Sequence, residues 1–242
     1  MRRSVAEQSN YLNPALSGLP EICPACFGAM PAGRGICGNC VESRTVSGGV
    51  LADVVAPITY RVGYQGQGAH DLRAYKADPA SSEAKLRLTC LFWDFCSRHL
   101  NCVKARLGIT GFTHVAFVPS TKRPGGVHPL QAMLSPLIPL KLAPLRLNSG
   151  IDSALRSMNT EWFAAEPLTS GRKQPSAVLL LEDTWVSGAR AQSAAHSLKK
   201  AGAERVGVIT LARQLNPDYA PAQPIIKELG KSRYDPERCV WH

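Results

Sequence analysis

Apolar positions alternate between strand-like and helix-like spacing along most of this chain. Residues 178–181 are four consecutive aliphatic residues, which is typical of a strand buried on both faces. The next apolar positions fall at helical spacing, and Gly202 is placed to end that helix; they are Ala191, Ala194, Ala195 and Leu198. A second apolar run, residues 206–211, follows. The order of strand, helix and strand predicts a βαβ unit in an α/β fold.

Other segments extend this pattern. Residues 58–64, 114–118 and 145–147 are predicted strands. A long helix is predicted from Asp78, as its N-cap, to Gly108, as its end. Its predicted buried face comprises Leu88, Leu91, Phe92, Phe95, Cys96, Leu100 and Val103.

The remaining segments are less regular. Residues 41–57, with two consecutive glycines, are predicted to be a linker. Residues 152–163 are predicted to be helical, with Leu155, Met158 and Trp162 on one side, and residues 221–229 form a proline-rich helical region. Residues 168–175 are predicted to be a polar loop.

An acidic pair and a small-residue turn follow the strand at 178–181. Backbone N–H groups of residues 186–190 would open the next helix without intrahelical partners, and the helix dipole would favour an anion there. Glu182 and Asp183 are expected beside that position, where carboxylates suit sugar hydroxyls or a partly hydrated Mg2+. A phosphate on the helix and a diol on the acids describe a ribose 5-phosphate. The alternative is a plain βαβ crossover with acids at a strand end.

The loop after the strand at 114–118 has a second anion-binding composition. It contains hydroxyls, cations and glycines in the segment Pro119-Ser120-Thr121-Lys122-Arg123-Pro124-Gly125-Gly126. Such a loop suits an oligophosphate, because Lys and Arg supply charge and Gly allows close backbone approach. A basic surface turn is the alternative. His128, just beyond the loop, is interpreted as either a ligand contact or a polar helix cap.

Four of the eight cysteines are spaced as metal ligands. Cys23 and Cys26 form one C-x-x-C pair, and Cys37 and Cys40 form the other. Four thiolates at this spacing predict a closed tetrahedral Zn2+ site with a structural role, because the intervening Gly, Pro and Ala residues cannot form a core of their own. A redox pair or free thiols are the alternatives.

The other four cysteines are not spaced as a second set of metal ligands. Cys90, Cys96 and Cys102 lie on or near the long helix at a spacing that does not converge, and buried free thiols are expected. Cys239 and His242 could approach a metal, but four better ligands already exist, and a tail that packs against the protein is the preferred interpretation.

Length, charge and apolar content limit the number of domains, the kinds of partner and the cellular location that we expect. The 242 residues allow one large domain or a domain with an appendage, divided here as residues 1–50 and 51–242. A net charge of +10 favours phosphorylated substrates or nucleic acid, although a solvated basic surface would give the same value. No run of 18 apolar residues and no signal-peptide core is present, so we expect no membrane partner and a cytoplasmic location.

The acidic segment resembles the phosphoribosyl-pyrophosphate (PRPP) motif of type I phosphoribosyltransferases. The matching residues are Glu182, Asp183, Ser187, Gly188 and Ala189. Val186 and Arg190 stand where hydroxyl residues are usual, and Arg190 could restore a phosphate contact as a charged donor.

A wider resemblance covers the chain from Cys23 to Arg213. It is similar to the ComF family of phosphoribosyltransferase-like proteins, particularly actinobacterial members. The similar segments are Cys23, Cys26, Cys37 and Cys40, Val118-Pro119, Arg156-x-x-Asn159-x-x-Trp162-Phe163, Glu182 to Arg190, and Thr210-Leu-Ala-Arg213. Gly126-Val-His128-Pro-Leu130-Gln departs from the family's usual Arg-Gly-Phe-Asn-Gln.

The resemblance implies a Rossmann-like, mostly parallel sheet flanked by helices, with an N-terminal zinc ribbon. It implies a phosphoribosyltransferase that uses PRPP with Mg2+, in which residues 186–190 bind the 5-phosphate and Ser120, Thr121 and Lys122 receive the pyrophosphate. Glu182 and Asp183 would be the catalytic pair, and the acceptor would be a nitrogen nucleophile. The alternative function is a non-catalytic accessory protein that binds single-stranded DNA in its uptake or processing. The sequence allows a homodimer but does not fix the oligomeric state.

Overall fold

The computed structural model describes residues 10–120, 126–150, 157–168 and 176–242, and its centre is a six-stranded mixed sheet. The strand order is β1 (Asn13–Pro14), β2 (Val54–Val62), β8 (Arg205–Leu215), β7 (Ala177–Trp185), β3 (His114–Phe117) and β4 (Lys141–Leu142). β1 is antiparallel to β2, and the other neighbouring pairs are parallel. The predicted α/β class with a mostly parallel sheet is confirmed.

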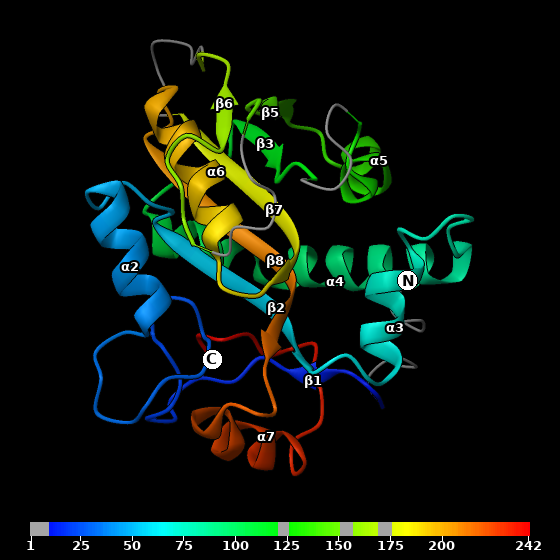
Figure 1. Ribbon diagram of the computed structural model, residues 1–242. Coiled ribbons are helices and arrows are strands. Elements are labelled where there is room, and N and C mark those ends of the chain that lie inside the picture. The colour runs from blue at the N-terminus through cyan, green and yellow to red at the C-terminus, as the bar shows by residue number, and fades with distance from the viewer. Residues whose placement is uncertain (1–9, 121–125, 151–156, 169–175) are drawn as a thin grey trace.

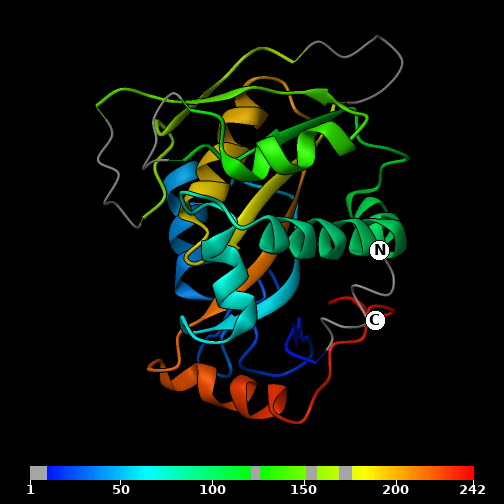
Figure 2. The same cartoon turned by 90° about the vertical axis from the view of Figure 1, so that its right-hand side faces the viewer.

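Helices cover both faces of this sheet (Figures 1 and 2). α2 (Gly38–Ser47) and α6 (Ala189–Lys200) lie on one face, and α4 (Ser82–Leu107) lies on the other with α3 (Gln67–Ala74) and α5 (Pro129–Leu134) beside it. The smaller elements are η1 (Ser135–Leu137), the two-stranded sheet of β5 (Leu145–Leu147) and β6 (Phe163–Ala165), η2 (Ala220–Ala222) and α7 (Gln223–Leu229). None of the helices in the described ranges combines the length and apolar composition needed to cross a membrane.

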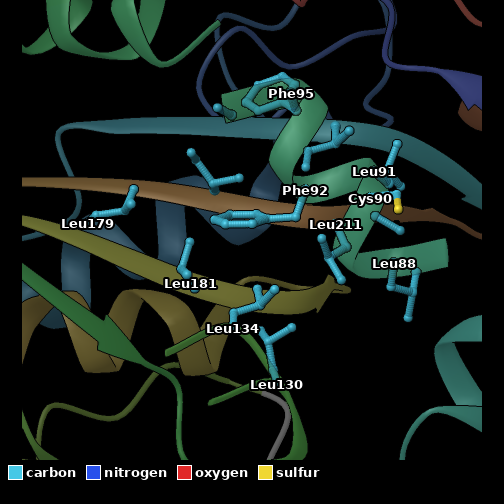
Figure 3. Close-up of a cluster of buried hydrophobic side chains, with 14 of the residues drawn as sticks. Leu88, Cys90, Leu91, Phe92, Phe95, Leu130, Leu134, Leu179, Leu181 and Leu211 are labelled. Atoms are coloured by element: carbon cyan, nitrogen blue, oxygen red, sulfur yellow. The ribbon is translucent and has the colours of Figure 1, made fainter. Parts of the chain in front are cut away.

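One of the two main core clusters lies between α4 and the sheet (Figure 3). Phe92 of α4 is 2% exposed and packs in one cluster with Leu179 and Leu181 of β7 and Leu211 of β8. Leu130 and Leu134 of α5 close the same cluster from the side of β7. Helical spacing of the apolar positions along α4 therefore predicted the face that packs on the sheet.

The core on the other face uses smaller side chains. Ala191, Ala194, Ala195 and Leu198 of α6 are all 0% exposed. They share one cluster with Val178 and Leu180 of β7 and with the four N-terminal cysteines. Alternation along β7 sends successive side chains to opposite faces, so each face receives its own set of aliphatic residues. The N-terminal segment thus shares a core with the sheet.

The order in which strands are added to the sheet reverses between β3 and β7. From β3 the chain continues outward to β4, whereas from β7 it continues to β8 on the opposite side. Open α/β sheets bind ligands at the carboxyl ends of strands where the order reverses in this way. The loop after β3 and the loop after β7 both begin at this position.

Three of the local expectations are wrong. The predicted linker at residues 41–57 is largely regular structure: residues 41–47 belong to α2, which ends at Gly48 with φ 61°, and residues 54–57 belong to β2. Residues 157–162 of the predicted helix at 152–163 are turns and coil, and Phe163 begins β6. α4 is capped by Ser81, whose Oγ accepts a hydrogen bond from the Ala84 N–H at 3.2 Å, instead of by Asp78.

Candidate functional site

The site at the end of β7 is built by the turn that leads into α6. Gly188 adopts a φ of 87°, a left-handed conformation that L side chains rarely take, and a Cβ there would lie 2.3 Å from the Trp185 ring. Glycine is therefore required at this position. The turn encloses a small pocket of about 70 Å³, which is lined by Trp162, Glu182, Thr184, Val186, Ser187, Gly188, Ala189 and Arg190.

Three buried polar atoms of the pocket lining have no hydrogen-bond partner among the described residues. They are Glu182 Oε2, Thr184 Oγ1 and Trp162 Nε1. A buried polar group without a partner costs about 1–3 kcal/mol, so native proteins rarely leave several together. The group includes two possible donors and two acceptors, and a polar ligand could satisfy all three atoms at once.

The amides at the start of α6 are partly satisfied within the protein. The Ala189 N–H donates to Ser187 Oγ at 3.3 Å. Arg213 of β8 holds the turn: its Nη1 donates to the carbonyl oxygens of Trp185 at 3.0 Å and Val186 at 2.7 Å. The backbone of the turn is thus fixed by a buried cation before any ligand arrives.

The two acidic residues lie within β7, near its end, and face different neighbours. Strand pairing with β8 continues to Trp185, so Glu182 and Asp183 alternate across the sheet. Glu182 lines the pocket on the α6 face. Asp183 lies on the α3 side, where Lys76 Nζ is 2.5 Å from Asp183 Oδ2 and the Tyr75 hydroxyl donates to the same oxygen. Both acids were expected beside the turn, but only Glu182 lines this pocket.

The surroundings push the pKa values of the two carboxyls apart. Burial, with the nearby charge of Asp183, raises the pKa of Glu182 to about 8. Burial alone would also raise the pKa of Asp183, but Lys76, His128 and the hydrogen bonds from Lys76 and Tyr75 hold that pKa below its ordinary value. At neutral pH the site therefore holds one protonated and one ionised carboxyl group, an arrangement common where acids have distinct tasks.

The end of β3 and the first residues after it lie next to this site. Phe117 of β3 pairs with Leu181 of β7, and the Val118 N–H donates to the Leu181 carbonyl at 3.1 Å. Ser120 is half-buried at the start of the loop. Thr121 and Lys122, the other two residues expected to bind pyrophosphate, lie outside the described residues.

His128 acts as a helix cap in this structure. Its Nδ1 accepts a hydrogen bond from the Leu130 N–H at 3.1 Å at the start of α5. Burial lowers the pKa of His128, although the charge of Asp183 opposes that shift. Of the two roles considered from the sequence, the polar cap is therefore present, and the residue also lies within the electrostatic reach of Asp183.

The four N-terminal cysteines converge on one point. Their sulfur atoms all lie within 4.8 Å of one another, with Cys23 Sγ 3.9 Å from Cys40 Sγ and Cys26 Sγ 3.6 Å from Cys37 Sγ. Four thiolates around a tetrahedral zinc are separated by about 3.8 Å. The Cys37 N–H also donates to Cys23 Sγ at 3.3 Å. This cluster can hold a metal ion such as zinc.

Arg213 connects the cysteine cluster to the β7 turn. In addition to the turn carbonyls, its Nε donates to the Cys26 carbonyl at 3.1 Å and its Nη2 lies 3.8 Å from Cys26 Sγ. A Cβ on Gly28 would lie 1.7 Å from the guanidinium, so the backbone just after the Cys23–Cys26 pair passes directly over the Arg213 side chain. The cysteine cluster and the turn beside the pocket therefore contact the same buried residue.

Several residues of the site were missed in the sequence. Thr184 and Trp162 line the pocket, and Tyr75 and Lys76 hold Asp183. Thr184 could have been found by extending the strand alternation two residues beyond Glu182. Tyr75 and Lys76 are separated from Asp183 by more than 100 residues, and only the fold brings them together.

The chain matches no known protein-family model, and no curated protein matches its sequence.

Proposed function

We propose that this protein is a phosphoribosyltransferase that binds PRPP at the end of β7, with a type I phosphoribosyltransferase fold related to the ComF family. The observation that carries the proposal is the pocket beside the Gly188 turn, in which Glu182 Oε2, Thr184 Oγ1 and Trp162 Nε1 lack partners in the described chain. The position of this pocket at the reversal point between β3 and β7 supports a ligand that spans both loops.

The chemistry of the pocket suits a sugar phosphate. The turn at residues 186–190 offers backbone donors and Arg190 to the 5-phosphate. Glu182, protonated below pH 8, offers both a donor and an acceptor to the ribose hydroxyls without repelling the phosphate. Ser120, Thr121 and Lys122 would receive the pyrophosphate.

The acidic pair would act differently during transfer. As the bond between C1 and the leaving oxygen breaks, positive charge develops on the ribose, and Asp183, which stays ionised, favours that state. Mg2+, when bound, would neutralise the leaving pyrophosphate, and Asp183 is the carboxylate whose charge suits it. A nitrogen nucleophile would then attack C1. The zinc in the N-terminal cluster would be structural, because four protein ligands close its coordination shell.

Calorimetry of PRPP binding in the presence of Mg2+ tests the proposal. We expect the wild-type chain to bind, and Glu182→Ala to weaken binding by about tenfold or more, since it removes a donor and an acceptor together worth about 1.5–3 kcal/mol. Asp183→Asn should weaken binding through loss of the negative charge that suits Mg2+. Ribose 5-phosphate alone should bind to the wild type and compete with PRPP.

Two exposed positions supply matched controls. Glu166→Ala and Asp218→Asn make the same chemical changes on the surface and should leave PRPP affinity unchanged. No binding by the wild type, or equal binding by the wild type and Glu182→Ala, would remove the assignment of the site.

The net charge of +10 favours the second candidate, a non-catalytic protein that binds single-stranded DNA. Such binding arises from phosphate contacts and weakens steeply with salt. Fluorescence anisotropy with a labelled oligonucleotide between 50 and about 200 mM salt distinguishes it. Absence of binding at the lower salt concentration would exclude this candidate.

A further inference from the structure

A second group of cysteine and histidine side chains lies outside the site described above. His99 and Cys102 of α4 meet Cys239 and His242 of the C-terminal segment. The potential ligand atoms of all four lie within 4.8 Å of one another. We propose that these four residues form a second metal site, which binds Zn2+ through two sulfur and two nitrogen atoms and fastens the C-terminal segment to α4.

The distances suit a tetrahedral ion. Cys102 Sγ is 4.0 Å from His99 Nδ1 and 3.8 Å from His242 Nε2, and Cys239 Sγ is 3.2 Å from His242 Nδ1. Zinc bonds of ordinary length place a thiolate and an imidazole nitrogen about 3.6 Å apart in a tetrahedron. Cys102 and Cys239 contact different ring nitrogens of His242, and a single zinc ion would bind only one of them. The four ligand atoms, one from each residue, lie within 4.8 Å of one another, so side-chain rotations suffice to bring them to zinc.

His99 is already oriented as a ligand. Its Nε2 lies 2.9 Å from the carbonyl oxygen of Pro236. Because a carbonyl only accepts hydrogen bonds, Nε2 must carry the proton, which leaves the bare lone pair on Nδ1, toward Cys102. Metal-bound histidines commonly use a backbone carbonyl in this way to fix the ring and its tautomer. His99 is 3% exposed, so this orientation is buried and fixed.

Each half of the cluster is pre-formed by local structure. His99 and Cys102 are three residues apart on a helix and therefore share a face. Cys239 and His242 are also three residues apart, and the His242 N–H donates to the Cys239 carbonyl at 3.0 Å, which closes a turn. A soft sulfur pair combined with two imidazoles is a donor set that selects zinc among the abundant divalent ions.

The C-terminal segment is also held by packing. Val240 is 2% exposed, Trp241 packs edge-on against Phe27 with ring centroids 6.4 Å apart, and Glu237 forms an ion pair with Arg98. Packing explains why the segment lies along α4, but it does not require two thiols and two imidazoles to converge. Because four protein ligands close a zinc shell, the site is structural.

Metal content measures the proposal directly. The full chain, expressed without an affinity tag and purified without chelator, should contain two zinc ions. Cys102→Ser and Cys239→Ser should each contain one. Cys90→Ser and Cys96→Ser are the matched controls on the same helix and should retain two, because neither belongs to either cluster.

Cobalt substitution provides a second measurement that does not depend on counting. The visible spectrum of the Co2+ protein should contain a component with two sulfur and two nitrogen ligands, which is lost in Cys102→Ser and in His242→Ala. His242 is exposed, so we expect His242→Ala to fold even if a cysteine variant does not, and its spectrum tests the site independently. One zinc in the wild type that Cys102→Ser and His242→Ala retain would overturn the proposal, as would a Cys102–Cys239 disulfide in protein purified in the presence of a thiol reductant.

Discussion

At the scale of single residues, Glu182 has the least favourable environment in the site. Its Oε2 is buried without a partner in the described chain, and burial raises its pKa to about 8. A group that is costly to bury in the free protein and lines a pocket indicates a site prepared for a ligand. Asp183, one residue away, has its pKa shifted the other way, because Lys76 and Tyr75 contact it.

The raised pKa of Glu182 predicts how stability changes with pH. Between its ordinary pKa of 4.5 and about 8, the folded chain holds a proton that the unfolded chain releases, so the free energy of unfolding falls as pH rises. Glu182→Gln should remove this fall, which we expect to be on the order of 2–4 kcal/mol. Urea unfolding at pH 5, 6.5 and 8 measures it.

Two comparisons isolate the effect of Glu182 on this pH dependence. Glu166→Gln, on the surface, should keep the wild-type slope. Asp183 does not interfere with this measurement. Its pKa is lowered in the folded chain, so its contribution to stability is complete above its ordinary pKa of 3.8 and is lost only at more acidic pH. Parallel curves for the wild type and Glu182→Gln would contradict the assigned ionisation.

At the scale of elements, α4 shows where sequence patterns succeed and where they stop. Its apolar face and its end at Gly108 were both predicted, because helical spacing and a left-handed glycine leave clear traces in sequence. Its start was misplaced. Asp78 before a proline has the features of a cap, but Ser81 supplies the hydrogen bond.

The correct cap can be tested by substitution. Ser81→Ala should lower the free energy of unfolding by about 1 kcal/mol, because the Ala84 N–H loses its acceptor. Asp78→Ala should change it by less than about 0.5 kcal/mol, since Asp78 is exposed and lies outside the helix. Urea unfolding compares the two variants. Equal losses would place the cap elsewhere.

Strands buried on both faces were the most predictable elements. β3 and the first part of β7 follow directly from runs of aliphatic residues. The continuation of β7 to Trp185 was not predicted, because Glu182, Asp183 and Thr184 interrupt the apolar pattern while pairing with β8 holds them in the strand. The same pairing separates the two acids, which a loop would have left side by side.

At the scale of the whole molecule, residues far apart in sequence complete the sites. The first cysteine cluster was predictable because its ligands occupy 18 residues, Cys23 to Cys40. The second group joins α4 to residues 239–242, and its spacing of about 140 residues carries no pattern in the sequence. Tyr75 reaches Asp183 in the same way, through the packing of α3 beside the sheet. Local chemistry could be predicted, and long-range convergence could not.

Arg213 makes the pocket depend on the N-terminal cysteines. It is 4% exposed and donates to the carbonyls of Cys26, Trp185 and Val186. Arg213→Lys should lower the free energy of unfolding by about 2–4 kcal/mol, because a lysine cannot reproduce this fork of bonds. It should also speed amide hydrogen exchange at residues 186–188. Arg205→Lys, at the exposed start of the same strand, should do neither.

Metal removal should reproduce the exchange effect without any substitution. An ion held by the four cysteines would fix Cys26, which contacts Arg213, and Arg213 holds the turn beside the pocket. Loss of the ion should therefore loosen residues 186–188. Hydrogen exchange followed by mass spectrometry before and after treatment with a chelator measures this, with β3 as the internal reference because none of these contacts involves it. If exchange at the turn stays constant while the metal is lost, Arg213 anchors the pocket independently of the cysteines.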